Sequence, residues 1–258
     1  MTARPQLINS TVAFALAALL MITVHEFGHA VAALLVGVDP TVYPFSVAAD
    51  GGSDHDQAFI ALAGPVVSLV VGAAVIALPR RPSGDAFVPL LVLWFGLLNL
   101  QEFAGYLVTG IIDNVGDVSS AYASLDAPLW VKVVVFAIGW ALTYLNGVIA
   151  TRRLLQMTDS QRDAAPQMRD LGLFAWLLGV VVVVVLGLGA YDLGSVDGAF
   201  EILGTVSIGI FLVFVRPLMR NLEVERRPPS YRLPIVGAVT LVVVAALRLI
   251  VLGPGLGL

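Results

Sequence analysis

The sequence predicts an all-α membrane protein, a polytopic transmembrane helical bundle of about seven helices. Of its 258 residues, 59% are hydrophobic and 12% are charged, and the mean hydropathy of +0.93 lies well outside the range of soluble domains. The apolar residues also gather in stretches long enough to cross a hydrocarbon core of roughly 30 Å as helices. Backbone amides in hydrocarbon must be satisfied within their own segment, which favours helices over strands for single spans.

Seven apolar stretches account for the predicted helices. They cover about residues 11–37, 58–78, 87–109, 128–150, 171–190, 199–215 and 233–252. The first is longer than the apolar region of a signal peptide and lacks a clear cleavage site, so we expect it to be retained. In the second, Gly64, Ser68 and Gly72 recur every four residues, which predicts a close approach by a neighbouring helix, and Pro65 is expected to bend the start of this helix.

The connections are too short to hold a soluble domain, so the chain forms one membrane domain. Between the first two spans, the prolines and glycines predict an irregular or hairpin-like loop around a β-prone piece, Thr41 to Val47. Nearly every polar feature of interest lies in residues 1–127, which we interpret as the functional core. Residues 128–258 add further transmembrane helices, and we interpret the last three of the seven spans as a scaffold.

Charge predicts the orientation of the bundle. Twelve of the 14 basic residues lie at the N-terminus or in the second, fourth and sixth connections: Arg4, Arg80, Arg81, Arg152, Arg153, Arg162, Arg169, Arg216, Arg220, Arg226, Arg227 and Arg232. The other connections carry aspartates and no arginine or lysine. The positive-inside rule makes the arginine-rich segments cytoplasmic. The remaining two, Lys132 and Arg248, are expected near outer helix ends, with their charges reaching towards water.

The motif HEFGH, residues 25–29, lies inside the first apolar stretch. On a helix, His25 and His29 fall on one face one turn apart, where two ring nitrogens can reach one metal ion, and Glu26 lies beside that face. Ionisable residues at membrane depth are costly and are functional by default. Zero cysteines exclude a thiolate ligand or nucleophile, so catalysis would have to use histidine, carboxylate or hydroxyl groups.

HEFGHAVAALLVGV, followed by AGPVVS at 63–68, resembles the site-2 protease family of intramembrane zinc metalloproteases. The resemblance covers about residues 20–125; its first motif is highly specific, and its Gly-Pro motif alone is weak. It implies a metalloprotease core in the first four segments, one Zn²⁺ per chain with His25 and His29 as ligands, and Glu26 as the catalytic base. It also implies that the Thr41 to Val47 piece receives an unwound substrate strand by edge pairing.

Members of this family supply a third ligand, an aspartate, from a later Leu-Asp-Gly motif that this chain lacks. Asp117 is the favoured candidate because it opens a helical-looking run, as in shorter branches of the family, and Asp113 is the alternative. Glu102 is a further possible ligand, and its alternative is pairing with nearby polar groups. Asn99 is a candidate match for the family's substrate-binding asparagine. His55, between two aspartates, is interpreted as a surface histidine.

These observations predict a multi-pass protein of the cell membrane whose partners are the lipid bilayer and a membrane-anchored protein substrate, with no nucleic acid. The expected activity is zinc-dependent hydrolysis of a peptide bond in or near a transmembrane segment. Two alternatives stay open: an inactive relative that binds a partner, because the Leu-Asp-Gly motif is missing, and a metal transporter. The charge pattern also leaves a conflict, because it places Asp113 and Asp117 near the outer face and His25 near mid-membrane. Either the third span folds back, or the first helix runs the other way.

Overall fold

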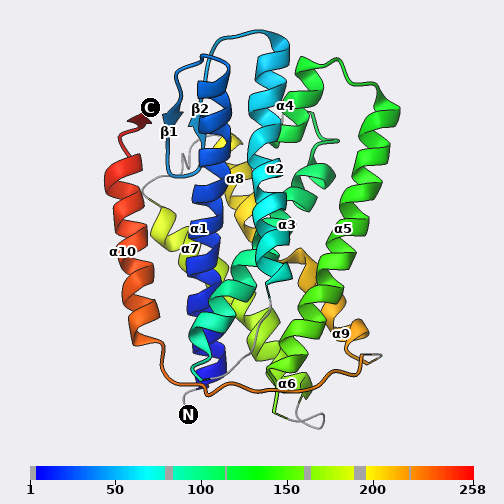
Figure 1. Cartoon of the computed structure of the whole chain (residues 1–258), viewed down its shortest axis with the longest axis vertical. Helices are drawn as coiled ribbons and strands as arrows, with labels where there is room; N and C mark the ends of the chain where they lie inside the picture. The colour runs from blue at the N-terminus through cyan, green and yellow to red at the C-terminus, as the bar shows by residue number, and fades with distance from the viewer. Residues whose placement is uncertain (1–3, 79–83, 114, 160–163, 189–195, 221) are drawn as a thin grey trace.

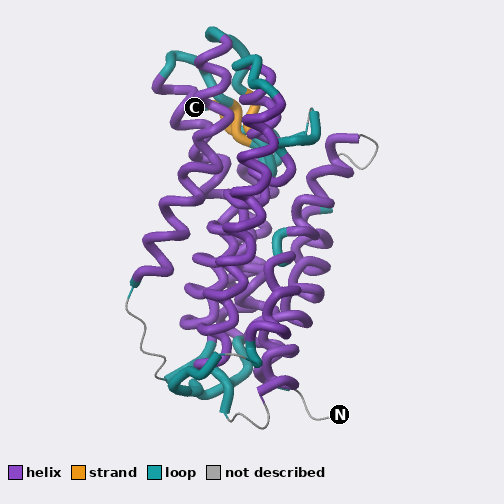
Figure 2. Tube along the Cα trace, turned by 90° about the vertical axis from the view of Figure 1, so that its right-hand side faces the viewer, coloured by secondary structure: helices purple, strands orange, loops and turns teal. Residues whose placement is uncertain are grey.

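The structure is a helical bundle, as predicted (Figure 1). It is a computed structural model that describes residues 4–78, 84–113, 115–159, 164–188, 196–220 and 222–258. Within these residues six helical stretches are long and apolar enough to cross a membrane. Figure 2 shows the long helices running side by side, with the small sheet near one end of the bundle. The chain is therefore an all-α, multi-pass membrane protein.

The elements follow one another in a regular up-and-down order in the first half of the chain. The helices are α1 (Pro5–Leu35), α2 (Asp54–Ala77), α3 (Phe87–Thr109), α4 (Gly116–Ser124), α5 (Leu129–Gln156), α6 (Ala164–Met168), α7 (Ala175–Gly187), α8 (Val196–Ser207), α9 (Val215–Leu218) and α10 (Ile235–Leu252). A π-helical segment, Arg169–Phe174, joins α6 to α7, and a 3₁₀ segment, Ile210–Phe214, precedes α9. The strands are β1 (Thr41–Val42), β2 (Val47–Ala48) and β3 (Leu256–Gly257).

Helix α1 lies at the centre of the bundle and packs against α2, α3, α7 and α10 (Figure 1). Its residues 13–19 are all buried, on every side of the helix. A helix that is apolar all round is stable only when other helices surround it. The alanines of this stretch leave little side-chain bulk between the backbones, so neighbouring helices can approach closely. The helix that carries the HEFGH motif is thus the best enclosed in the protein.

The predicted sixth apolar stretch, about residues 199–215, is not one spanning helix. Helix α8 ends at Ser207, and the chain resumes as the 3₁₀ segment and the short α9. Gly209 lies at the break, where its backbone has left helical geometry. The stretch is apolar, as predicted, but periodicity alone does not reveal an interruption at a glycine. The fifth predicted stretch begins about two turns earlier than expected, since its helical run starts at Ala164.

The predicted hairpin forms, and it gains a third strand that the sequence did not suggest. Strand β1 pairs antiparallel with β2 on one side and with the C-terminal β3 on the other. The central strand β1 therefore has no free edge, and only the outer edges of β2 and β3 are left among the described strands. Addition of a substrate strand to β1, as the resemblance implied, would require β3 to leave.

The arginine-rich connections meet at one end of the bundle. The segment before α10 runs beside the end of α5, where the Arg227 amide donates to the Gln156 carbonyl, and Arg4 pairs with Asp170 at 3.3 Å. This common end agrees with the charge pattern. Arg80, Arg81, Arg162 and Asp192, which belong to that pattern, lie outside the described residues.

Arg248 lies near an end of α10, as predicted, but the prediction that its charge reaches towards water is wrong. Its side chain is buried and points from α10 into the bundle, where it donates to the Leu19 carbonyl, the Thr23 hydroxyl and the Pro44 carbonyl. The guanidinium also lies over the ring of Phe45, 5.3 Å from its centroid. One buried cation therefore joins α10, the hairpin and the part of α1 that precedes His25.

We expect Arg248→Gln to destabilise the protein by about 2 kcal/mol, because the Pro44 carbonyl loses a charged donor inside the bundle. The free energy of unfolding in mixed micelles, titrated with a denaturing detergent, measures this. Arg220→Gln is the matched control, because Arg220 is exposed, and it should change stability by less than about 0.5 kcal/mol. Equal stability of the two variants would contradict a structural role for Arg248.

Candidate metal centre

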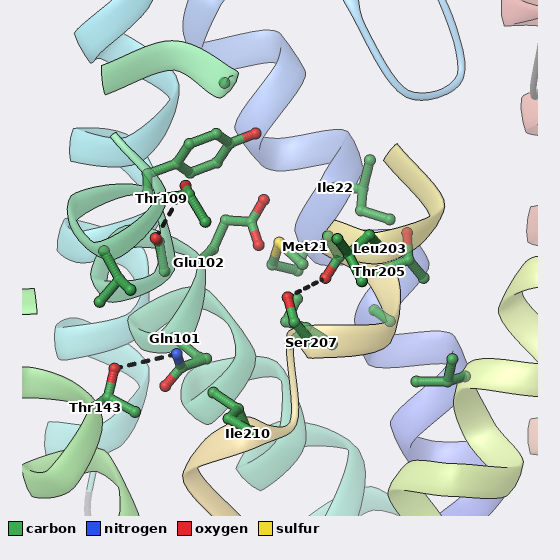
Figure 3. Close-up of a pocket in the computed structure, with 18 of the residues that line it drawn as sticks. Met21, Ile22, Gln101, Glu102, Thr109, Thr143, Leu203, Thr205, Ser207 and Ile210 are labelled. Atoms are coloured by element: carbon green, nitrogen blue, oxygen red, sulfur yellow. Dashed lines mark hydrogen bonds between the residues drawn. The ribbon is translucent and has the colours of Figure 1, made fainter. Parts of the chain in front are cut away.

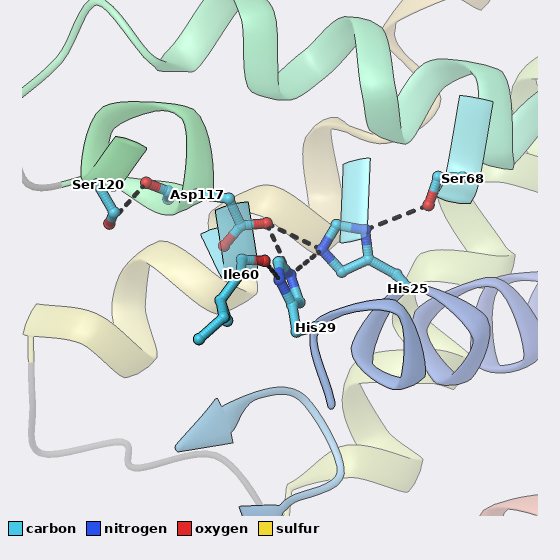
Figure 4. A network of polar contacts seen from close by, with 7 residues as sticks. His25, His29, Ile60, Ser68, Asp117 and Ser120 are labelled. Atoms are coloured by element: carbon cyan, nitrogen blue, oxygen red, sulfur yellow. Dashed lines mark hydrogen bonds and ion pairs between the residues drawn. The ribbon is translucent and has the colours of Figure 1, made fainter. Parts of the chain in front are cut away.

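Two histidines from α1 and one aspartate from α4 meet at a point (Figure 4). The Nε2 atoms of His25 and His29 lie 3.0 Å apart, and Oδ2 of Asp117 lies 2.9 Å from the first and 3.1 Å from the second. A tetrahedral zinc ion with bonds of roughly 2.0–2.1 Å spaces its ligand atoms roughly 3.3 Å apart. The three atoms therefore form a triangle of nearly the size that one zinc ion requires.

The outer nitrogens of both imidazoles are held by other groups. Nδ1 of His29 lies 2.7 Å from the carbonyl oxygen of Ile60, and Nδ1 of His25 lies 3.2 Å from the Ser68 hydroxyl. A carbonyl only accepts hydrogen bonds, so Nδ1 of His29 carries a proton, and when the ring is neutral its Nε2 presents a lone pair. That lone pair faces another ring nitrogen and a carboxylate oxygen. A metal cation satisfies all three atoms, and metal-binding histidines are commonly oriented by such second contacts.

Helix α2 supports the histidines through one face of its own. Its first turn is fixed by a capping box between Ser53 and Asp56. Further along, Gly64 and Ser68 fall on one face, four residues apart, against α1. Pro65 has no amide hydrogen to give to the preceding turn, which loosens the hydrogen bonding close to the Ile60 carbonyl that His29 uses. The Gly-Pro motif thus has a local physical role at the ligands.

A side chain at Gly64 would enter the space of His29, one of the two predicted metal ligands. A Cβ atom added there would overlap the His29 ring at Nε2. We therefore expect Gly64→Ala to weaken zinc affinity about 10–100-fold, as changes in groups that orient a ligand do, with the helical content unchanged. Zinc titration against a competing chelator, with circular dichroism alongside, measures both.

Gly105→Ala is the matched control for this variant. Gly105 is also a glycine inside a membrane helix, but a Cβ atom there would meet only the Gln101 side chain, at 4.0 Å. This variant should keep the zinc affinity of the wild type. If Gly64→Ala also kept it, the His29 ring would not be held where the structure places it.

Asp117 reaches the histidines because the chain turns sharply after α3. Gly116 has φ +74°, a conformation that L side chains rarely adopt, and a Cβ atom there would lie 2.8 Å from the Tyr106 ring. Tyr106 in turn stacks on the His25 ring, with centroids 5.1 Å apart. Burial by itself would raise the pKa of Asp117, but the two imidazoles beside the carboxylate hold it below its ordinary value. The group is therefore an anion at neutral pH.

The predicted conflict between the depth of His25 and that of Asp113 and Asp117 in the membrane disappears because α1 is longer than α3. The Trp94 indole donates to the Ser10 hydroxyl at 2.9 Å, and His25 and Tyr106 stack further along, so the two helices run in the same direction. At about 1.5 Å per residue, the end of α3 at Thr109 is level with His25, and α1 continues to Leu35 beyond that level. Neither a fold-back of the third span nor a reversed first helix is needed.

The other predicted candidates lie elsewhere. Asp113 pairs with Lys132 at 2.9 Å, and its side chain is 79% exposed against 23% for Asp117. His55 is exposed in the first turn of α2, which agrees with a surface histidine. Asn99 is buried, and its amide donates to the Phe95 carbonyl at 2.8 Å. Glu102 does not belong to the three-residue group; it lines a cavity beside it.

That cavity has a volume of about 490 Å³ and lies between α1, α3, α5, α7 and the chain around the end of α8 (Figure 3). Glu26 is on its wall and is 6% exposed, so the residue next to His25 faces this cavity. The sequence predicted His25, Glu26 and His29 from their spacing. It did not reveal that Tyr106 packs on the site, for which there was no local signal.

Comparison of the chain with models of protein families, with curated proteins and with solved structures found no match. The conclusions about function therefore depend on the chemistry and geometry of the site.

Proposed function

We propose that the chain is a zinc-dependent intramembrane protease that hydrolyses a peptide bond in or near a transmembrane segment of a membrane-anchored protein. The observation that carries the proposal is the meeting of the ligand atoms of His25, His29 and Asp117 inside a membrane bundle, with Glu26 facing the adjoining cavity. Two histidines and one carboxylate form the ligand set of a catalytic rather than a structural zinc site, since a structural site uses four protein ligands.

Different residues would have different roles in hydrolysis. His25, His29 and Asp117 would hold the ion, which when bound supplies Lewis-acid chemistry that polarises a peptide carbonyl and makes water a better nucleophile. Glu26 accepts a proton from the attacking water and returns it to the leaving nitrogen as the carbon–nitrogen bond breaks. Both products are then complete, a carboxylic acid and an amine, and Glu26 regains its starting charge.

The cavity supports this chemistry in two ways. It brings space to Glu26, in which water and a peptide group can be accommodated beside the carboxylate. Its volume also corresponds to only about one turn of a helix that is about 10 Å across. A substrate segment must therefore be unwound to reach Glu26, and unwinding exposes the carbonyls that a helix otherwise keeps in its own hydrogen bonds.

Purified protein in liposomes provides the test. We expect about one zinc ion per chain, cleavage of single-span model substrates whose segment carries helix-breaking residues, and loss of cleavage after treatment with a chelator that zinc reverses. A preparation that contains no stoichiometric metal after zinc loading would overturn the proposal. Zinc-dependent passage of metal across the liposome membrane without cleavage would favour a transporter.

A further inference from the structure

The cavity beside the metal centre is acidic and has no basic residue on its wall. Its lining is mostly apolar, with Glu26 from α1 and Glu102 from α3 as the two charged groups (Figure 3). Among the described residues that line it there is no lysine, arginine or histidine. Figure 3 shows the Glu102 carboxylate extending from α3 into the space towards Met21 of α1. The cavity therefore concentrates negative charge in an apolar setting.

Neither carboxylate has a hydrogen-bond donor within the described part of the chain. Glu26 is buried, with 6% of its surface exposed, and it lines the cavity. An ionised carboxylate in apolar surroundings is costly unless a cation or donors compensate it. In the proposed zinc centre the charge of the ion is balanced by Asp117 and Glu26. Glu102 then remains as an acid on the cavity wall with no described hydrogen-bond donor, and a cation that enters the cavity would be its natural partner.

The rest of the wall suits the same kind of ligand. Aromatic rings line the space: Phe14, Tyr106 and Trp140, together with Phe45, one face of which already carries the Arg248 guanidinium. Aromatic faces attract ammonium and guanidinium groups, more strongly when these are removed from water. Apolar side chains such as Ile22 and Val183 would cover an aliphatic stem. An acid, aromatic rings and an apolar wall together favour a cation on an alkyl chain.

We propose that this cavity binds a basic side chain of the substrate, lysine or arginine, close to the bond that is cut, with Glu102 as the specificity-determining acceptor. The inference deepens the proposed protease function and rests on it. The stem of the side chain packs on the apolar wall while its charge meets Glu102. This would select substrates in which a basic residue at the membrane boundary accompanies the unwound segment.

A binding experiment tests the site without any need for cleavage. The probes are n-hexylammonium and n-hexanol, which share a stem and differ in charge, and calorimetry measures their binding to zinc-loaded protein in micelles. We expect the wild type to bind the ammonium at least about 10-fold more tightly. Glu102→Gln, which keeps the shape of the side chain, should bind the two probes equally, and Glu223→Gln, at an exposed acid far from the cavity, should behave as the wild type. Equal binding of the probes to the wild type would overturn the inference.

A cleavage series then separates the two proposals. Model substrates carry lysine or the apolar norleucine at successive positions around the cut bond. At one position we expect the lysine substrate to have a KM at least about 10-fold lower, with little change in kcat, and Glu102→Gln should remove this difference. Cleavage without a charge preference would refute the inference about the cavity, and the proposal that the chain is a protease would stand. Preferential binding of the ammonium with no cleavage of any substrate would refute the proposed protease function but not the cation site.

Discussion

Glu26→Gln is expected to abolish cleavage while the protein keeps its zinc. Glutamine has nearly the size of glutamate but cannot accept a proton from water, and general-base groups contribute about 10²–10⁴-fold to rate. The ligand atoms of His25, His29 and Asp117 are unchanged by this substitution, and no described group donates a hydrogen bond to Glu26 that the change would break. Cleavage of a single-span substrate in liposomes and zinc content per chain are the two measurements.

The same variant distinguishes the alternative functions. Glu223→Gln is the matched control, because it makes the same chemical change at an exposed position and should leave cleavage unaltered. A transporter would keep its metal flux in Glu26→Gln, and an inactive relative would show no cleavage before or after the change. A Glu26→Gln protein that cleaved at the rate of the wild type would remove Glu26 from the reaction.

The sequence predicted the membrane class and most helices because hydrophobic length is a local property. Six of the seven stretches became helices of spanning length, as the thickness of a hydrocarbon core requires. It could not predict the break near Gly209 or the inward direction of Arg248. Both depend on neighbours that are distant in the chain: the acceptors of Arg248 are more than 200 positions away. The pairing of β1 with the C-terminal β3 is unpredictable for the same reason.

At the site, the spacing of residues along one helix was sufficient to predict that the two histidines lie together. Positions 25 and 29 had to share a face of α1, and the structure places their Nε2 atoms 3.0 Å apart. The choice between Asp113 and Asp117 needed the turn after α3, which depends on Gly116 and on the packing of Tyr106. The structure brings Asp117 to the histidines and Asp113 to Lys132. The zinc-ligand roles themselves stay predictions until metal is measured.

The second large effect is expected from Asp117→Ala, which should lose zinc. Zinc bound by four protein ligands gains roughly 10–16 kcal/mol, so removal of one ligand costs about 3 kcal/mol, which corresponds to a Kd at least about 100-fold weaker. The two imidazoles that remain would share the ion only with water. Zinc titration against a chelator of known affinity measures the change, and cleavage should fall with zinc occupancy.

Asp113→Ala provides the comparison that makes this result specific. Both substitutions remove one carboxylate from the same turn, so any general effect of charge or of a loosened loop should appear in both. Among the described residues Asp113 pairs with Lys132 at the surface, an interaction of about 0–1 kcal/mol, and its loss should leave zinc affinity within about threefold of the wild type. If Asp113→Ala lost zinc and Asp117→Ala kept it, the ligand assignment would have to be reversed. If neither variant changed zinc affinity, the ion would be held without an aspartate from this turn, and the three-ligand centre proposed for His25, His29 and Asp117 would be wrong.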